Sequence, residues 1–232
     1  MSLSRRSVVR WMAAVPVTMV AGRIFAADKK EAPPEEPKEK NKDVKWQSLF
    51  DGKSLGHWKS TQFGGEGEAK VENGQLLLTH GETLTGVTWQ GPVPAKMNYE
   101  IELDAQRVDG SDFFCGLTFP YNDASASLIL GGWGGGVCGI SCIDDNDAAR
   151  NDTTSVHSFK TGQWYHVRLR VTADNISAWV DKEQIVDADI KGKKISVRAE
   201  VEASQPMGIA TYQTTGEIKN IRLRKLDAAE KK

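Results

Sequence analysis

The 232-residue sequence is poor in cysteine, in excess charge of either sign and in long apolar runs. Its three cysteines, Cys115, Cys138 and Cys142, are too scattered for a zinc site. The chain has 31 acidic residues against 30 Lys and Arg, so it lacks the basic excess of nucleic-acid-binding proteins. No apolar run after residue 22 is long enough to cross a bilayer as a helix. Composition therefore excludes a nucleic-acid partner, and a membrane partner once the N-terminal segment is removed.

The first 27 residues are typical of a bacterial export signal of the twin-arginine type. Arg5 and Arg6 precede an apolar stretch at residues 11–22, and small residues at 26–27 offer a cleavage site. An uncleaved anchor is the alternative. Cleavage would place the protein in the periplasm or outside the cell.

Residues 28–43 are charged and rich in proline, with too little apolar surface to order them. We therefore predict a disordered linker there. The remaining residues, 44–228, suit a single β domain.

The cysteines allow two interpretations. Cys138 and Cys142 are four apart on a predicted strand, about 13 Å, which is too far for a disulfide. Cys115 can pair with either if the strands are neighbours, since exported proteins tolerate disulfides. The alternative is three buried thiols that act as small apolar residues.

Apolar and polar residues alternate in almost every segment of the predicted domain. Asn73-Gly74 is typical of a two-residue hairpin turn. Residues 99–106 carry an acidic face and residues 165–171 a basic face, and we expect the two to meet as cross-strand ion pairs. Further strands are predicted at residues 176–181, 195–201 and 217–226. Without any helical stripe, the pattern predicts an all-β sandwich of two antiparallel sheets.

A glycine-dense segment, residues 131–136, surrounds Trp133 between two apolar β-rich runs. Glycines remove side chains around the indole, so that a flat ligand such as a sugar can stack on it. The alternative is a tight strand corner with a buried tryptophan. Phosphate binding is not indicated, because no helix follows the glycines.

Several segments together resemble one protein family. They are the opening LFDGKSLGHW at residues 49–58, GQWYHVR at 162–168, ISAWVD at 176–181, PMGIA at 206–210 and KNIRLRKL at 219–226. The chain resembles the 3-keto-disaccharide hydrolase family, also named the 3-keto-glucoside lyase/hydratase domain and formerly domain of unknown function 1080. The resemblance spans residues 46–226.

This resemblance implies a concanavalin A-like jelly roll of two curved antiparallel sheets. It also implies action on glycosides oxidised to the 3-keto form, where a base removes an acidified C–H proton and a cation or donor stabilises the enolate. A divalent metal would fit such chemistry. The chain departs from the family in its middle, since the usual arginine is absent near residues 119–120 and the usual Glu and Gln are replaced by apolar residues at 127–131.

Candidate site residues fall into three groups. The candidates for acid–base catalysis are Glu66, Glu200 and His166. Those for carbohydrate binding are Trp89, Asp112, Tyr121, Trp133 and Arg168. Those for a divalent cation such as Ca²⁺ are Asp144, Asp145, Asp147 and Asn151.

Each group has a simpler interpretation. The carboxylates can be solvated or ion-paired, some of the aromatic residues can belong to the core, and Asp and Asn often only form turns. We predict an exported carbohydrate-active protein, a hydrolase or lyase of 3-keto-glycosides. A non-catalytic carbohydrate-binding module is the alternative.

Overall fold

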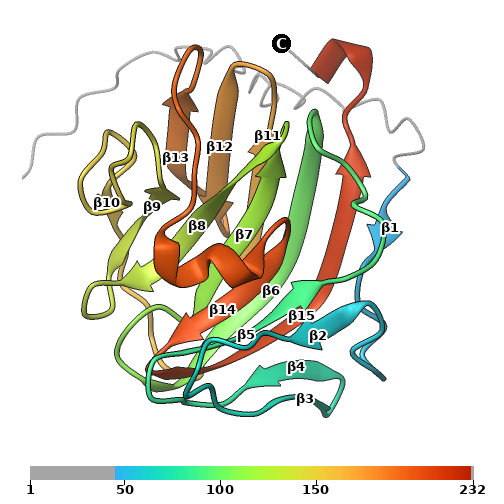
Figure 1. Ribbon diagram of the computed structural model, residues 1–232, viewed down its shortest axis with the longest axis vertical. Helices are drawn as coiled ribbons and strands as arrows, with labels where there is room; N and C mark the ends of the chain where they lie inside the picture. Colours follow the sequence, from blue (N-terminus) through green and yellow to red (C-terminus); the bar gives the residue numbers. More distant parts are fainter. Residues whose placement is uncertain (1–44, 231–232) are drawn as a thin grey trace, which may run out of the picture. The chain divides into compact units, whose positions relative to one another are not determined.

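The computed structural model describes residues 45–230, which form two antiparallel β-sheets that enclose one hydrophobic core (Figure 1). The predicted export signal and linker lie outside the described residues. No helix within residues 45–230 is both long and apolar enough to cross a membrane. The short 3-10 helices are η1 (Ala199–Ser204) and η2 (Ala228–Glu230).

One sheet, called sheet A here, has eight strands. Their order is β13 (Glu183–Asp189), β12 (Asn175–Val180), β11 (Tyr165–Val171), β6 (Tyr99–Gly110), β15 (Thr214–Lys225), β4 (Gln75–Leu78) and β3 (Ala69–Glu72), with β1 (Gln47–Ser48) also paired to β15. The long strands β6 and β15 lie side by side at its centre (Figure 1).

The other sheet, called sheet B, has seven strands. Their order is β10 (Ser155–Val156), β9 (Val137–Ser141), β8 (Ala124–Gly132), β7 (Cys115–Tyr121), β14 (Gly208–Tyr212), β5 (Leu84–Trp89) and β2 (Trp58–Ser60). The alternating pattern therefore predicted the fold class correctly.

The predicted hairpin is present. β3 and β4 pair across Asn73 and Gly74, both of which have positive φ, as a tight two-residue turn requires. The predicted strands at 99–106, 165–171, 176–181 and 217–226 correspond to β6, β11, β12 and β15.

The predicted strand at residues 195–201 is wrong. Ser196 exchanges two backbone hydrogen bonds with Cys142, but the following bonds, from Val201 to Arg198 and from Gln205 to Glu202, close turns. The chain then forms η1, which packs against β5 and β14 of sheet B. Of the alternating apolar residues in this segment only Ile195 is buried and Ala199 is exposed, so the alternation here does not mark a core-facing side.

The acidic and basic faces meet as predicted, on the outer face of sheet A. Each acid of β6 stands between two basic residues: Glu100 between Arg170 and Arg224, Glu102 between Arg168 and Arg222, and Asp104 between His166 and Lys219. Glu100 is almost fully buried, and its oxygens accept hydrogen bonds of 2.7 Å from Arg170 and 2.6 Å from Arg224. The charges of this face thus neutralise one another.

All three cysteines are free and buried, which confirms the alternative of buried thiols. Cys115 pairs in register with Leu130, which pairs in turn with Cys138. The two thiols therefore lie two strands apart, about 10 Å, beyond the reach of a disulfide. Burial raises the pKa of Cys115 to about 12 and that of Cys138 to about 11.

Candidate functional site

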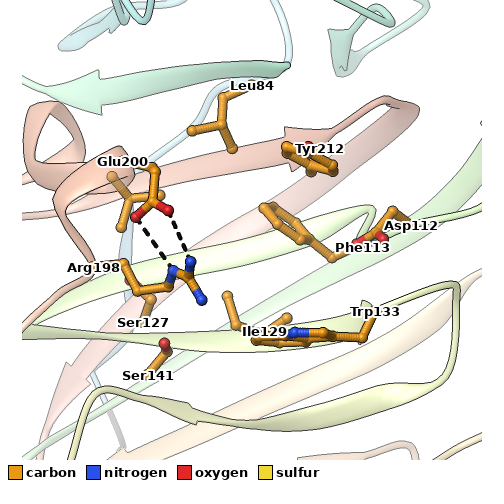
Figure 2. Close-up of a pocket in the computed structure, with 11 residues that line it drawn as sticks. Leu84, Asp112, Phe113, Ser127, Ile129, Trp133, Ser141, Arg198, Glu200 and Tyr212 are labelled. Atoms are coloured by element: carbon orange, nitrogen blue, oxygen red, sulfur yellow. Dashed lines mark hydrogen bonds and ion pairs between the residues drawn. The ribbon is translucent and has the colours of Figure 1, made fainter. Parts of the chain in front are cut away.

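A pocket of about 310 Å³ opens on the outer face of sheet B. It is lined by Leu84, Asp112, Phe113, Ser127, Ile129, Trp133, Ser141, Arg198, Glu200, Val201 and Tyr212. The aromatic side chains of Phe113, Tyr212 and Trp133 lie across it from Arg198 and Glu200 (Figure 2).

The floor of the pocket follows from the alternation of strand side chains. In β8, Leu128 and Leu130 belong to the core, so that Ser127 and Ile129 face outward. Ser127 pairs in register with Ser141 of β9, which places the two serines side by side on the floor, where the Ser127 hydroxyl exchanges a hydrogen bond of 2.8 Å with that of Thr118.

Glycine makes the floor deep. Gly116 of β7 lies opposite Ile129, and a Cβ added there would stand 3.0 Å from the Phe113 ring. Because Gly116 has no side chain, the Phe113 ring packs directly on the strand as one wall of the pocket.

Trp133 belongs to residues 131–136, called the Trp133 turn here, which comprise the last two residues of β8 and the turn that leads into β9. Trp133 has a φ of 51°, and Gly131, Gly134 and Gly135 also have positive φ, which glycine adopts without steric cost. The indole is 45% exposed, so the alternative of a buried tryptophan is wrong. The turn presents one aromatic surface at the pocket.

Asp112 lines the pocket but binds the Trp133 turn. Its Oδ2 accepts a hydrogen bond of 3.0 Å from the backbone N–H of Gly134, and its Oδ1 accepts one of 2.8 Å from that of Phe113. Both carboxylate oxygens are thus engaged by the protein.

Arg198 and Glu200 form the charged wall. Arg198 donates from Nε and Nη2 to the Glu200 carboxylate, at 3.3 and 2.8 Å, and from Nη1 to Asp147 at 2.8 Å. The hydrogen bonds to Arg198 lower the pKa of Glu200, and those to Glu200 raise the pKa of Arg198. At neutral pH the pocket therefore contains a carboxylate and a guanidinium in contact.

A model of the 3-keto-alpha-glucoside-1,2-lyase-like domain matches residues 45–224. The chain belongs to this family. The match confirms the resemblance found in the sequence and covers almost all of the described residues. Among curated proteins, none matches the sequence.

Solved structures share the fold at low sequence identity. A family GH16 non-specific endo-beta-1,3(4)-glucanase has a TM-score of 0.54 and 13% identity, over 79% of this chain and 97% of that one. A protein with a galectin-like fold from Bacillus subtilis has a TM-score of 0.51 and 9% identity, over 72% and 89%. A predicted glycosyl hydrolase from Parabacteroides distasonis has a TM-score of 0.50 and 15% identity, over 78% and 94%. This member of the 3-keto-glucoside lyase-like family is thus a concanavalin A-like jelly roll.

Of the predicted catalytic residues, only Glu200 lines the pocket. Glu66 lies in an exposed loop, where its carboxylate accepts a hydrogen bond from the backbone N–H of Gly64. His166 lies on the outer face of sheet A, 2.9 Å from Asp104. Strand periodicity separates inner from outer faces but does not distinguish the outer faces of the two sheets, which explains the misplacement of His166.

Of the predicted carbohydrate-binding residues, Trp133 and Asp112 line the pocket and three do not. Trp89 is buried in the core, where its ring centroid lies 5.1 Å from that of Trp58. The Tyr121 hydroxyl donates to the carbonyl oxygen of Ala173. Arg168 stacks on Trp179 in sheet A, with its guanidinium carbon 3.8 Å from the ring centroid.

The four predicted metal ligands are bound to other protein groups. The carboxylates pair with three different cations, Asp144 with Lys193, Asp145 with Lys194 and Asp147 with Arg198. The Asn151 amide donates to three carbonyl oxygens. Within residues 45–230, no group of three His, Cys, Asp or Glu side chains could hold a metal ion. The structure therefore does not bring these residues together as a cation site.

Sequence reasoning missed most of the pocket lining, because small outward residues carry no distinctive signal. Ser127 and Ser141 became visible as a pair only through the register of β8 and β9. Tyr212 ends the apolar strand β14, and Phe113 stacks against it with ring centroids 5.9 Å apart. The available signal was the alternation of alanine and serine at residues 124–127 of β8.

Proposed function

We propose that the protein is a lyase that cleaves 3-keto-glycosides by elimination in the pocket on sheet B. Family membership supports the substrate class. The observation that carries the proposal is the presence, in one pocket, of the exposed Trp133 indole and the Arg198–Glu200 pair.

The pocket matches the size and chemistry of a sugar ring. Its volume of about 310 Å³ lies at the lower end of the range for small-molecule sites, roughly 300–1,000 Å³. The apolar C–H face of a sugar would pack on the Trp133 indole, and its hydroxyl groups would exchange hydrogen bonds with Ser127 and Ser141.

Glu200 would act as the base. A ketone at C3 acidifies the neighbouring C–H bond, and the Glu200 carboxylate takes that proton, leaving its electron pair as an enolate. The enolate then re-forms the ketone and a C=C bond while the glycosidic C–O bond breaks. The departing oxygen takes a proton from water, and the hydroxide that remains takes the proton from Glu200, which restores the carboxylate. The products are a free alcohol and a sugar with a conjugated enone.

Arg198 would stabilise the enolate. A guanidinium has five N–H groups, of which three donate to Glu200 and Asp147. The other two have no partner among residues 45–230 and would donate to a negatively charged oxygen in the pocket, where a preorganised cation favours the enolate.

Binding without turnover is the second candidate. It is favoured by the lowered pKa of Glu200, because a base works best when its pKa is close to the working pH. Ultraviolet absorbance of the enone separates the two functions. A 3-keto-disaccharide is mixed with the wild-type protein and with Glu200→Gln, and binding is measured in parallel.

The lyase predicts enone formation by the wild type and a loss of about 100-fold or more in Glu200→Gln, with binding retained. Binding without enone would support the module, and equal turnover by both proteins would exclude Glu200 as the base. Neither turnover nor binding would refute both functions.

We also propose export, on the sequence of residues 1–27 alone. Replacing Arg5 and Arg6 by lysine should retain the protein in the cytoplasm, as measured by cell fractionation. Unchanged export would refute a twin-arginine signal.

A further inference from the structure

Arg107 is a buried cation in a position that the strand pattern reserves for the core. The preceding inward residues of β6 are Tyr99, Ile101, Leu103 and Ala105, all of them buried and apolar. Arg107 continues this series and is only 6% exposed. A buried charge is costly unless it is hydrogen-bonded, so its contacts must offset that cost.

The side-chain hydrogen bonds of Arg107 go to the Trp133 turn and to Asp112, whose carboxylate binds that turn. Its Nη2 donates to the carbonyl oxygens of Gly135 at 3.0 Å, Asp112 at 3.1 Å and Gly131 at 3.4 Å. Its guanidinium carbon lies 5.2 Å from the centroid of the Phe114 ring. The Nε group has no hydrogen-bond partner within residues 45–230, and burial lowers the pKa of the side chain.

The three carbonyl groups frame the turn. Gly131 and Gly135 lie on either side of Trp133 in the turn, and Asp112 binds the N–H of Gly134 between them. We infer that Arg107 is a positioning residue, which reaches from sheet A across the core and fixes the Trp133 turn so that the indole faces the pocket.

The packing at Gly131 supports this role. A Cβ added to Gly131 would stand 2.6 Å from Nη2 of Arg107, so the guanidinium lies directly against the backbone of the turn. Four residues of the turn, 131 and 133–135, have positive φ. A cation bound to the inward carbonyl groups holds this backbone in one conformation, which its glycines would otherwise leave free to change.

The first test needs no ligand. Hydrogen–deuterium exchange is followed in the peptide that spans residues 131–136, in the wild type and in Arg107→Met. Because a hydrogen bond from a charged donor is stronger than one from a neutral donor, its loss should accelerate amide exchange in this peptide about tenfold or more. Arg168→Met, on the outer face of sheet A, is the matched control and should leave it unchanged. Arg107→Lys should restore part of the protection.

The second test rests on the proposed function, because it measures affinity for a 3-keto-disaccharide. Arg107→Met should bind the sugar at least about threefold more weakly than the wild type. The double variant Arg107→Met/Trp133→Ala should differ from Trp133→Ala alone by less than about twofold. A residue that supports only general stability would weaken both proteins equally.

The outcomes separate the two proposals. Unchanged exchange at residues 131–136 in folded Arg107→Met would overturn the positioning role, and so would equal losses of affinity in the two backgrounds. If the wild type binds no sugar, the proposed function fails while the exchange test still decides the role of Arg107. If Arg107→Met does not fold, Arg107→Lys takes its place, since the lysine side chain ends one bond short of the position of Nη2 and should keep only part of the protection.

Discussion

Replacing Trp133 by alanine should weaken sugar binding by about 1.4 kcal/mol, or about tenfold. A tryptophan offers up to about 250 Å², of which the exposed 45% is about 110 Å². A sugar that covers half of this buries about 55 Å² of indole, which contributes about 1.4 kcal/mol.

Isothermal titration calorimetry with a 3-keto-disaccharide measures this loss. Trp179→Ala is the matched control, because Trp179 lies in β12 of sheet A and stacks on Arg168. It should bind the sugar as the wild type does, and Trp133→Phe should retain part of the affinity. If folded Trp133→Ala binds within about twofold of the wild type, the indole is not the sugar platform and the site proposal fails.

Three further predictions concern the pocket and the opposite sheet. Gly116→Val should push the Phe113 ring into the pocket, because even a Cβ at position 116 would stand 3.0 Å from that ring. Calorimetry should then show a loss of sugar affinity, while the melting temperature falls only slightly. Glu100→Gln should lower the free energy of unfolding, measured by urea denaturation, by about 3 kcal/mol, since it removes the carboxylate from a buried network of ion pairs. A loss below about 1 kcal/mol would show that solvent screens these ion pairs. The hydrogen bond from Arg224 lowers the pKa of Glu230 from its ordinary 4.5 to about 2, so the stability it contributes is complete above pH 4.5 and is lost as the pH falls toward 2. Melting temperatures of the wild type and Glu230→Gln should therefore converge as the pH is lowered from 4.5 to 2.

The sequence predicted the strands because alternation directly records which side chains face the core. The ion pairs between residues 99–106 and 165–171 followed from charge rows of matching period. Residues 195–201 had the same alternation, but only Ile195 of its apolar residues is buried, and the segment turns into η1 instead of joining sheet B as a strand. Alternation alone therefore does not distinguish a strand from a segment that turns away from the sheet.

The pocket was less predictable because its lining comes from five separate parts of the chain. The glycines around Trp133 indicated an exposed indole, which the structure contains. The sequence also singled out Glu200, but on a strand, whereas it lies in η1. His166 and Arg168 carry suitable functional groups but lie on sheet A, whereas the pocket lies on sheet B. Which strands join which sheet depends on pairing between residues far apart in the sequence. The role of Arg107 needed the three-dimensional contacts, because in sequence it is one more residue of an alternating strand.

The alternation of β8 has an evolutionary consequence. Leu128 and Leu130 build the interior, while Ser127 and Ile129, one position away, line the pocket on the outer face. Substitutions on the outward side can therefore remodel what the domain recognises while leaving the hydrophobic interior intact. A scaffold of this kind can diversify its ligands through single replacements at low cost to folding.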